Sequence, residues 1–474
     1  MRTAKPELTA RLYLPCGEKP SFRTLPARAL LREVRGGEKL SPVWEVQLPS
    51  EAEPLLPALA DLSARGETDL GRLLAGYGDL ILRSERGEYA ARLPEAAPVL
   101  QDLSIDQIDI PTDEVIGYDE YARIMEQLRR VPGLRVCEAG RSMQGRRIWT
   151  IEPASTRRGY VSRVKMLRYF PSVLINGRHH ANEVSATNAI FAFVRELLTK
   201  PAWRGVGDEL TMTIVPAENV DGVALHAELQ KEHPWWQHHA CYTNSVGADL
   251  MPHYYIPETR VTEALVFQRV LRERLPDVML DLHGVPHHEM PQNFSQLKGY
   301  KGLWIPRALL CDFYFHIDDP DYASNKTLSL GWSKAVQREF RDWERFTQIN
   351  RAWEARFNKY AFGKTDDSFP CEWDGNLLNY WIPSPYNPRH PYPTVSAPWI
   401  MSLIYTAEAA DETAHGSCLA DCAEAHLRHV RAGLRYLRSL RAVSDEGCAR
   451  AEDGSLQLRS FRHRPLLPPN NQPE

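Results

Sequence analysis

Apolar runs of strand length alternate with amphipathic helical stretches over most of the chain from about residue 114 onward. The predicted strands lie at 173–175, 211–215, 278–282 and 399–407, and helical spacing recurs at 186–198, 259–275, 321–362 and 421–440. Strands that alternate with helices favour an architecture in which helices flank a sheet. The pattern therefore predicts an α/β fold for this part of the chain.

Two of the predicted strands end in residues that commonly bind metal ions. His180 and Glu183 follow the strand at 173–175, and His283 follows the strand at 278–282. In open α/β sheets, ligands bind beyond the carboxyl ends of strands. Three protein ligands would hold a zinc ion with one position open for catalysis. The spacing alone leaves an alternative open, in which His180 caps a helix and His283 bonds to a backbone carbonyl.

Other histidines compete for the same role. Only His180 stands three residues before Glu183, so His179 is expected to support the site from behind or to face solvent. His287 could pair with His283 on a helix, but the glycine and the proline between them disfavour a helix there. His287 is therefore expected to line a pocket or the surface.

The composition is that of a soluble globular protein, with 43% apolar residues, 25% charged residues and a net charge of −4. No basic block points to nucleic acid or to an anionic membrane as a partner. The amino-terminal residues lack the apolar core of a signal peptide, and no apolar run approaches the ~18 residues of a membrane span. Eight cysteines are scattered without a CxxC pair. Such cysteines fit reduced thiols, so a cytoplasmic location is expected.

At 474 residues the chain is long enough for two or three domains. Short strand-like segments around one helical stretch predict a small α+β accessory domain at residues 1–108. Residues 106–113 are a predicted linker, because Pro111 interrupts regular structure. The catalytic domain is predicted at 114–442. The proline-rich tail at 443–474 is predicted to be disordered.

Over residues 114–442 the chain resembles the M14-type zinc carboxypeptidases. Five elements occur in the family's order: Gly140-Arg-Ser-Met-Gln-Gly145, His180-Ala-Asn-Glu183, Pro216-Ala-Glu-Asn-Val-Asp-Gly222, His283 and Thr406-Ala-Glu-Ala-Ala-Asp411. The resemblance implies a mixed, mostly parallel eight-stranded sheet between helices, with zinc at one sheet edge.

The resemblance also assigns the site. It implies one Zn²⁺ per chain, held by His180, Glu183 and His283, and makes Glu408 the catalytic general base. Zinc lowers the pKa of a bound water to about 7, and a carboxylate beside it can accept the proton. The alternative for Glu408 alone is an ordinary carboxylate at the start of a helix.

One part of the family pattern is missing. Family members hold the terminal carboxylate of the substrate with an Asn-Arg pair, and here Met251 and Pro252 stand at those positions. Neither side chain can pair with a buried carboxylate. Residues 221–249 also contain no arginine, so the arginine that helps the oxyanion is missing too. The substrate-binding residues are therefore unknown. The alternative donors are Arg178, Arg260, Arg389, Gln237, His238 and His239, and Tyr380 and Tyr386 are candidates for either a lid or simple packing.

The function predicted from these observations is that of a zinc-dependent metallohydrolase that cleaves a peptide or amide bond, with a peptide or small amide as its partner. One alternative is a deacylase of N-acyl amino acids, like the desuccinylase and aspartoacylase relatives of the family. Another is a non-catalytic binding protein on the same fold. The presence of all three ligands together with Glu408 disfavours the last alternative. The oligomeric state does not follow from the sequence.

Overall fold

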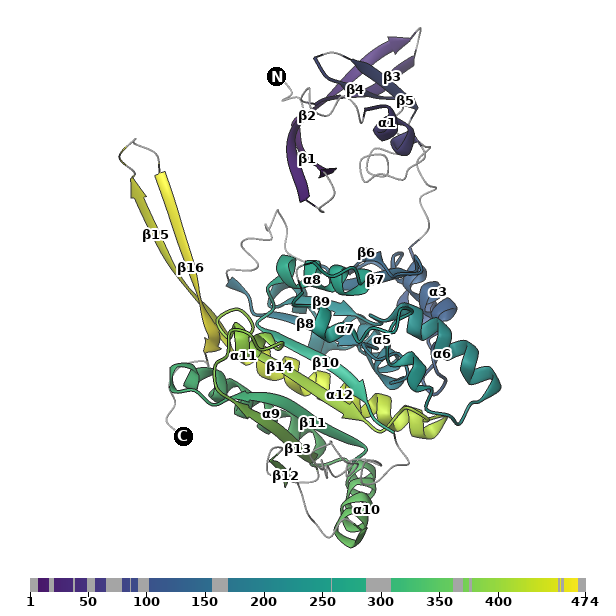
Figure 1. Cartoon of the computed structure of the whole chain (residues 1–474), viewed down its shortest axis with the longest axis vertical. Coiled ribbons are helices and arrows are strands. Elements are labelled where there is room, and N and C mark those ends of the chain that lie inside the picture. The colour runs from purple at the N-terminus through teal and green to yellow at the C-terminus, as the bar shows by residue number, and fades with distance from the viewer. Residues whose placement is uncertain are drawn as a thin grey trace. The chain divides into compact units, whose positions relative to one another are not determined.

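The computed structural model describes residues 7–16, 21–36, 39–48, 56–64, 79–85, 87–92, 102–155, 169–256, 258–286, 308–360, 370–374, 377–450, 452 and 456–467. The chain divides into two compact units, Met1–Gln101 and Asp102–Glu474. Figure 1 shows both units, and each is described by itself.

The first unit is a five-stranded sheet with one helix. Its strands lie in chain order, β1 (Glu7–Cys16), β2 (Ser21–Gly36), β3 (Lys39–Gln47), β4 (Asp79–Arg83) and β5 (Glu88–Arg92). Neighbours are antiparallel except β3 and β4, which are parallel and are joined through the helix α1 (Leu56–Ala64). Leu56, Leu80 and Leu82 are fully buried. The described residues therefore agree with the predicted small α+β domain.

The second unit is built on one mixed sheet. In spatial order its strands are β12 (Cys371–Asp374), β13 (Leu377–Ser384), β11 (Leu310–Ile317), β14 (Leu403–Ala409), β10 (Val278–Gly284), β8 (Ser172–Gly177), β9 (Thr211–Val215), β7 (Arg147–Pro153) and β6 (Leu134–Arg141). The four strands from β14 to β9 are parallel, and β11 is parallel to β13. The other four neighbouring pairs are antiparallel.

The expected mixed α/β sheet between helices is confirmed, but two details of the expectation were wrong. Among the described residues this sheet has nine strands instead of eight, and its parallel and antiparallel pairs are equally frequent. The antiparallel pairs β6–β7 and β12–β13 are hairpins at the two margins of the sheet, and the pairs β7–β9 and β11–β14 join these margins to the parallel centre. The central strands β8, β9 and β10 are buried at every residue, as parallel strands are when helices cover both faces.

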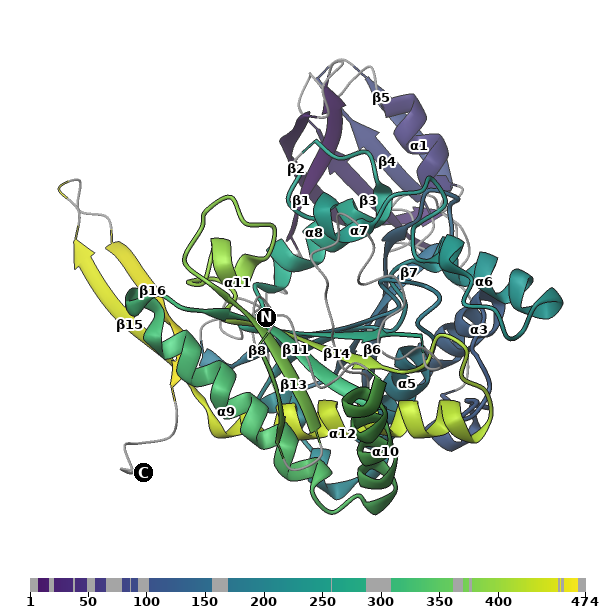
Figure 2. The same cartoon turned by 60° about the horizontal axis from the view of Figure 1, so that its bottom comes forward.

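Helices cover both faces of this sheet, as Figure 2 shows. The helices α5 (Ser185–Thr199), α12 (Ser417–Ser439) and α9 (Ala323–Phe340) pack side by side along one face, and α8 (Thr262–Arg274) and α11 (Pro393–Ser396) lie on the other. The remaining helices are α3 (Tyr118–Leu128), α6 (Val220–Glu232), α7 (Leu250–His253) and α10 (Glu344–Tyr360). Short 3-10 turns are η2 (Ile105–Gln107), η3 (Pro201–Trp203), η4 (Val206–Asp208), η5 (His239–Cys241) and η6 (Pro320–Tyr322).

The predicted linker and the predicted domain boundary differ from the structure. Ile108 and Ile110 are buried in the core of the second unit, and the carbonyl of Ile108 accepts a hydrogen bond from Arg195 on α5. The division between the units falls at Gln101. The segment predicted as a linker packs into the second unit because its apolar isoleucine side chains gain stability by burial against the neighbouring helix.

The prediction of a disordered tail was wrong for most of its length. Residues 441–467 contain an antiparallel hairpin of β15 (Arg441–Arg450) and β16 (Leu456–Leu467), which projects from the sheet in Figure 1. Its base is held by charge, since Nε of Arg464 lies 3.1 Å from Oδ1 of the buried Asp277. Composition alone could not reveal this distant partner. Residues 468–474 lie outside the described residues.

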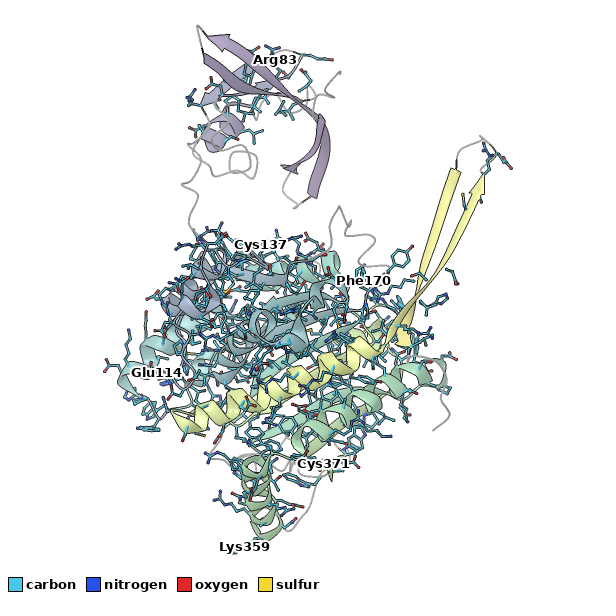
Figure 3. The ribbon with its side chains drawn as sticks, turned by 180° about the vertical axis from the view of Figure 1, so that it is seen from behind. Arg83, Glu114, Cys137, Phe170, Lys359 and Cys371 are labelled. Carbon is cyan, nitrogen blue, oxygen red and sulfur yellow. The ribbon has the colours of Figure 1, made fainter. Side chains whose placement is uncertain are left out.

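Two other expectations can be compared with the structure. The seven cysteines with described side chains are free, among them Cys137 and Cys371, which are labelled in Figure 3. None of the helices in the described ranges combines the length and apolar character needed to cross a membrane.

Candidate metal centre

His180, Glu183 and His283 meet beyond the carboxyl ends of two neighbouring parallel strands, β8 and β10. Nδ1 of His180 lies 2.6 Å from Oε1 of Glu183, and Nδ1 of His283 lies 3.0 Å from Oε2 of Glu183. One ligand atom from each residue can be chosen so that all lie within 4.8 Å of one another, and all three residues are buried. The structure therefore brings together the three residues that the sequence predicted as ligands.

The loop after β8 holds this geometry. Arg178 has a φ of 54°, which turns the chain sharply after the strand, a backbone state that costs about 1–3 kcal/mol for a residue other than glycine. Its buried guanidinium donates to the carbonyls of Ile116 and Ala181. Arg178 therefore braces the loop from inside and is not placed to bind a substrate. The backbone N–H of Gly284 donates to Oε2 of Glu183 at 2.9 Å and so fixes the carboxylate.

Glu408 is the register partner of His283 on the adjacent parallel strand β14. Register partners in a sheet point to the same face, so the half-buried Glu408 lies on the metal side of β14. Burial raises the pKa of Tyr242 and of Tyr392, and the negative charge of Glu408 makes a smaller contribution in the same direction. The predicted general base thus shares one edge of the sheet with the predicted ligands.

Asp411 ties the strand of the predicted base to the helix that follows the ligand loop. Its Oδ2 accepts hydrogen bonds from the backbone N–H of Ser185 at 2.6 Å and from Oγ of Ser185 at 2.5 Å. Ser185 is the first residue of α5, two residues after Glu183. Burial raises the pKa of Asp411 to about 8. The end of β14 and the start of α5 are therefore fixed relative to each other.

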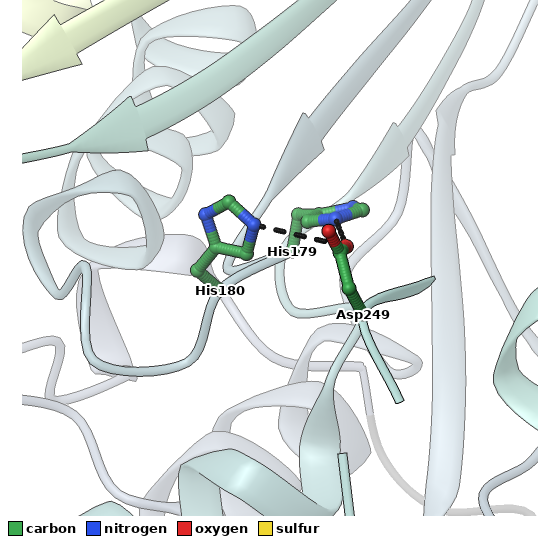
Figure 4. Close-up of side chains that lie close together, drawn as sticks. All are labelled: His179, His180 and Asp249. Atoms are coloured by element: carbon green, nitrogen blue, oxygen red, sulfur yellow. Dashed lines mark hydrogen bonds and ion pairs between the residues drawn. The ribbon is translucent and has the colours of Figure 1, made fainter. Parts of the chain in front are cut away.

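A carboxylate faces the outer nitrogen of each ligand histidine. Oδ2 of Asp281 lies 3.0 Å from Nε2 of His283, and Oδ1 of Asp249 lies 4.0 Å from Nε2 of His180 (Figure 4). Histidines that bind metal ions commonly have such a partner, which sets the ring orientation and tautomer. The sequence carried a signal for Asp281, because residues two apart on a strand share a face.

The donor set fits a zinc ion. Burial lowers the pKa of His180 to about 4, which leaves a neutral imidazole with a free lone pair. Burial opposes ionisation of Glu183, but His180 and His283 outweigh it and lower the pKa of this carboxyl. Burial likewise opposes protonation of His283, but Asp281 and Glu183 outweigh this effect and raise the pKa of His283. Buried carboxylates thus demand a cation here, and imidazole and carboxylate groups are common zinc ligands.

Comparison with known proteins agrees with this geometry. Residues 121–264, which include His180 and Glu183, match the M14 peptidase family model, described as zinc carboxypeptidase. This part of the chain is similar to the zinc carboxypeptidases. No curated protein matches the sequence.

Solved structures of carboxypeptidases are similar to the chain at low identity. A metallo-carboxypeptidase from Burkholderia cenocepacia is 16% identical with a TM-score of 0.40, and the match covers 67% of this chain and 69% of that one. Carboxypeptidase A from Helicoverpa armigera is 12% identical with a TM-score of 0.42, and the match covers 86% of this chain and 91% of that one.

Two of the motifs that resemble the zinc carboxypeptidase pattern meet at one buried carboxylate. Asp221, the second residue of α6, accepts hydrogen bonds from Oγ of Ser142 at 2.6 Å and from the backbone N–H of Gln144 at 2.9 Å. Arg146 and Ser245 also reach Asp221, each at 2.9 Å. The segment at 140–145 therefore has a structural role in this chain, because it binds the first turn of α6.

The positions of the missing carboxylate clamp lie on α7. Met251 is half-buried and Pro252 is exposed, and neither offers a donor. Arg260 and Arg389 are exposed. His238 bonds to the carbonyl of His233, and His239 bonds to Gln237, so these candidates interact with one another and with their own loop.

The tyrosines proposed as a lid are engaged in packing. Tyr380 is buried on β13 and stacks on Phe313 with ring centroids 4.8 Å apart, and Tyr386 lies against Tyr322 and Trp399. His287 lies outside the described residues.

His179 lies behind the ligands, which was one of the two positions expected for it, and it forms buried hydrogen bonds with Tyr254 and Asp249. Sequence reasoning missed Tyr242, Glu218 and Tyr254. The ring of Tyr242 stacks on His180 with centroids 3.5 Å apart and planes at 19°, and Tyr254 donates to Glu218. Nothing in the spacing of these three residues marks them, because they approach the site from separate loops.

Proposed function

We propose that this protein is a zinc-dependent hydrolase that cleaves a peptide or amide bond. His180, Glu183 and His283 would hold one zinc ion per chain, and Glu408 would act as the general base. The observation that carries the proposal is the placement of Glu408 beside His283 in the register of two parallel strands, on the same sheet edge as the three-residue cluster. The match of residues 121–264 to the family model described as zinc carboxypeptidase supports it.

Zinc in such a site supplies Lewis acidity, which polarises the scissile carbonyl and makes water acidic enough to react near neutral pH. The protein's own groups account for the remaining steps. The carboxylate of Glu408 takes the proton of the attacking water and then returns it to the nitrogen of the leaving amine. The carboxylate of Asp281, 3.0 Å from Nε2 of His283, holds the orientation of that imidazole, and the carboxylate of Asp249 faces Nε2 of His180 at 4.0 Å.

The substrate requirement follows from the clamp positions. With Met251 and Pro252 in place of Asn-Arg, neither clamp position supplies a partner for a buried carboxylate, whose desolvation needs a cation or several donors. We therefore propose that a free carboxylate at the end of the substrate is not required. This reasoning also counts against a deacylase of N-acyl amino acids, because that substrate carries a free carboxylate as well.

The test of the chemistry separates metal binding from proton transfer. The Glu408→Gln variant should keep its zinc and lose about 10²- to 10⁴-fold in kcat on a peptide substrate, since the amide cannot accept a proton. The His180→Ala variant should lose the zinc as well as the activity, as measured by atomic absorption. A matched control, Glu424→Gln on the surface of α12, should behave as wild type. An active Glu408→Gln variant would remove Glu408 from the mechanism.

The test of the substrate class compares peptides that differ only at the carboxyl terminus. Free and amidated forms of one peptide should be cleaved with similar kcat/KM. A strong preference for the free carboxylate would show that a cation from another loop has taken over the role of the clamp. Hydrolysis of N-acyl amino acids in preference to both peptides would favour the deacylase alternative.

A further inference from the structure

His179, the neighbour of a predicted ligand, is buried and uses both ring nitrogens. Its Nδ1 lies 2.7 Å from the hydroxyl oxygen of Tyr254, and its Nε2 lies 3.2 Å from Oδ1 of Asp249 (Figure 4). Asp249 and Tyr254 are the residues that cap the two ends of α7. One imidazole therefore holds both ends of this helix against the loop of His180.

Glu218 completes the arrangement from the turn after β9. It is 1% exposed, and Nδ1 of His179 lies 3.5 Å from its Oε2. The hydroxyl of Tyr254 donates to Oε1, and the side-chain amide of Asn176 donates to Oε2 at 2.7 Å. A buried carboxylate is stable only when paired and hydrogen-bonded.

These four residues, Asn176, His179, Glu218 and Tyr254, form a buried hub that reaches the outer side of both ligand histidines. On one side, His179 binds Asp249, which faces Nε2 of His180. On the other side, the amide of Asn176 donates to Oδ1 of Asp281 at 3.0 Å, and Oδ2 of Asp281 faces Nε2 of His283. A continuous chain of polar contacts thus connects the two carboxylates that orient the ligand rings.

We propose that His179 and Glu218 are a pair of positioning residues that sets the zinc affinity of the centre by holding Asp249 and Asp281 in place together. The proposal rests on the metal centre of the proposed function and extends it to residues outside the ligand set. Neither residue is a zinc ligand in this assignment. Their effect passes through the carboxylates, whose loss in metal sites commonly weakens metal binding about 10- to 100-fold.

A competing assignment would place a second ion between His179, His180 and Asp249, whose ligand atoms also lie within 4.8 Å of one another. The contacts favour the positioning role. Both nitrogens of His179 already have partners in Tyr254 and Asp249, and Nδ1 of His180 faces Glu183. A second ion would therefore have to displace the hydrogen bonds of His179 and share the ring of His180 with the first.

The experiment measures zinc affinity on the full-length, metal-free protein by competition with a chromophoric chelator. Glu218→Gln keeps the shape of the side chain and removes the charge opposite His179, so zinc should bind about 10- to 100-fold more weakly. Glu263→Gln is the matched control. Glu263 is equally buried and bonds to Met143 and Asn244, away from the hub. The control should bind zinc like wild type even where its unfolding midpoint falls.

A double-mutant cycle tests whether the two residues act as a pair. His179→Gln should weaken zinc binding as Glu218→Gln does, and the double variant should lose clearly less than the product of the two single losses. If Glu218→Gln does not fold, Tyr254→Phe serves in its place, because it removes one hydroxyl of the hub, and a smaller loss of zinc affinity is expected.

Four results would overturn the proposal. The first is wild-type zinc affinity in Glu218→Gln, or in Tyr254→Phe if that variant is used. The second is an equal loss of zinc affinity in Glu263→Gln, and the third is a fully multiplicative loss in the double variant. The fourth is a stoichiometry of two zinc ions per wild-type chain, which would establish the second-ion site. A wild-type protein that binds zinc but cleaves no peptide would overturn the proposed function and leave this inference standing.

Discussion

At the scale of single residues, the metal centre depends on a position where no side chain fits. Gly284 follows His283 at the end of β10, and its N–H binds Glu183. A Cβ at this position would lie 1.9 Å from Oδ1 of Asp411 and 3.0 Å from Cβ of Glu183. The backbone of β10 can therefore approach the ligand loop only because residue 284 is glycine.

This close approach predicts the effect of adding one methyl group at residue 284. Gly284→Ala should reduce the free energy of unfolding by about 1–3 kcal/mol, as overpacked sites do, and should also weaken zinc binding, because Glu183 must move. Urea unfolding and chelator competition measure the two effects. Gly447→Ala is the matched control in a strand, since nothing lies within 4 Å of its added Cβ. Equal behaviour of the two variants would contradict the argument.

A second residue-scale prediction concerns pH. Burial, followed by the charges of Arg178 and His238, lowers the pKa of His226 well below its ordinary value, and the side chain is fully buried. His226 is then neutral when folded and takes up a proton on unfolding below about pH 6.5. Its contribution to stability is present above that pH and is lost as the pH falls.

Replacement of this histidine should therefore flatten the acid side of the stability profile. In His226→Leu, the fall in the free energy of unfolding between about pH 6.5 and pH 4 should be less steep by up to about 1.4 kcal/mol per pH unit, the effect of one proton. Urea unfolding at a series of pH values measures the slope. An unchanged slope would show that His226 also takes up its proton in the folded chain over this range.

At the scale of elements, the hairpin β15–β16 shows how one buried charge can anchor a projecting segment. A two-stranded hairpin by itself is marginally stable in water. Arg462 and Arg464 at its base have side chains that are 9% and 8% exposed, and both reach Asp277, which is 0% exposed. Asp277 also accepts the N–H of Ser172 at 2.8 Å and thereby ties the hairpin to the start of β8.

Loss of this carboxylate should affect more than the hairpin. Asp277→Ala removes the carboxylate that two largely buried arginines share and should lower the free energy of unfolding by about 3–5 kcal/mol, with faster proteolysis of the hairpin. Asp445→Ala is the control in the same hairpin, because it removes only the exposed pair with His463 and should cost less than about 1 kcal/mol. A small effect of Asp277→Ala would mean that the arginines find other partners.

At the scale of the whole molecule, the chain divides at Gln101, and every residue of the proposed metal centre lies in the second unit. The second unit has its own extensive core, which includes the buried isoleucines of the expected linker. We propose that the first unit is an accessory domain that the metal centre does not need.

A shortened chain tests this independence. Residues 102–474 expressed alone should unfold cooperatively and bind zinc with the affinity of the full chain, because their core and their ligands are complete. Calorimetry of both proteins and chelator competition are the measurements. Aggregation of the shortened chain, or a loss of zinc affinity, would assign the first unit a structural role.

The sequence by itself determined the chemistry that depends on local spacing. His180 and Glu183 are three residues apart after a strand, His283 ends a second strand, and alternating strands and helices predict the layers that bring those strand ends together. The absence of Asn-Arg at Met251 and Pro252 was equally visible. These features can be predicted because strand and helix periodicity acts over a few residues.

Only the tertiary structure decided the surroundings. His179, Glu218 and Tyr254 come from three separate loops, and the hairpin depends on Asp277, far away in the chain. Such contacts leave no periodic pattern, because they depend on which strands become neighbours in the sheet. The strands β11 to β13 and the antiparallel pairs of the sheet were not predicted for the same reason, since the order of strands in the sequence does not show which strands pair.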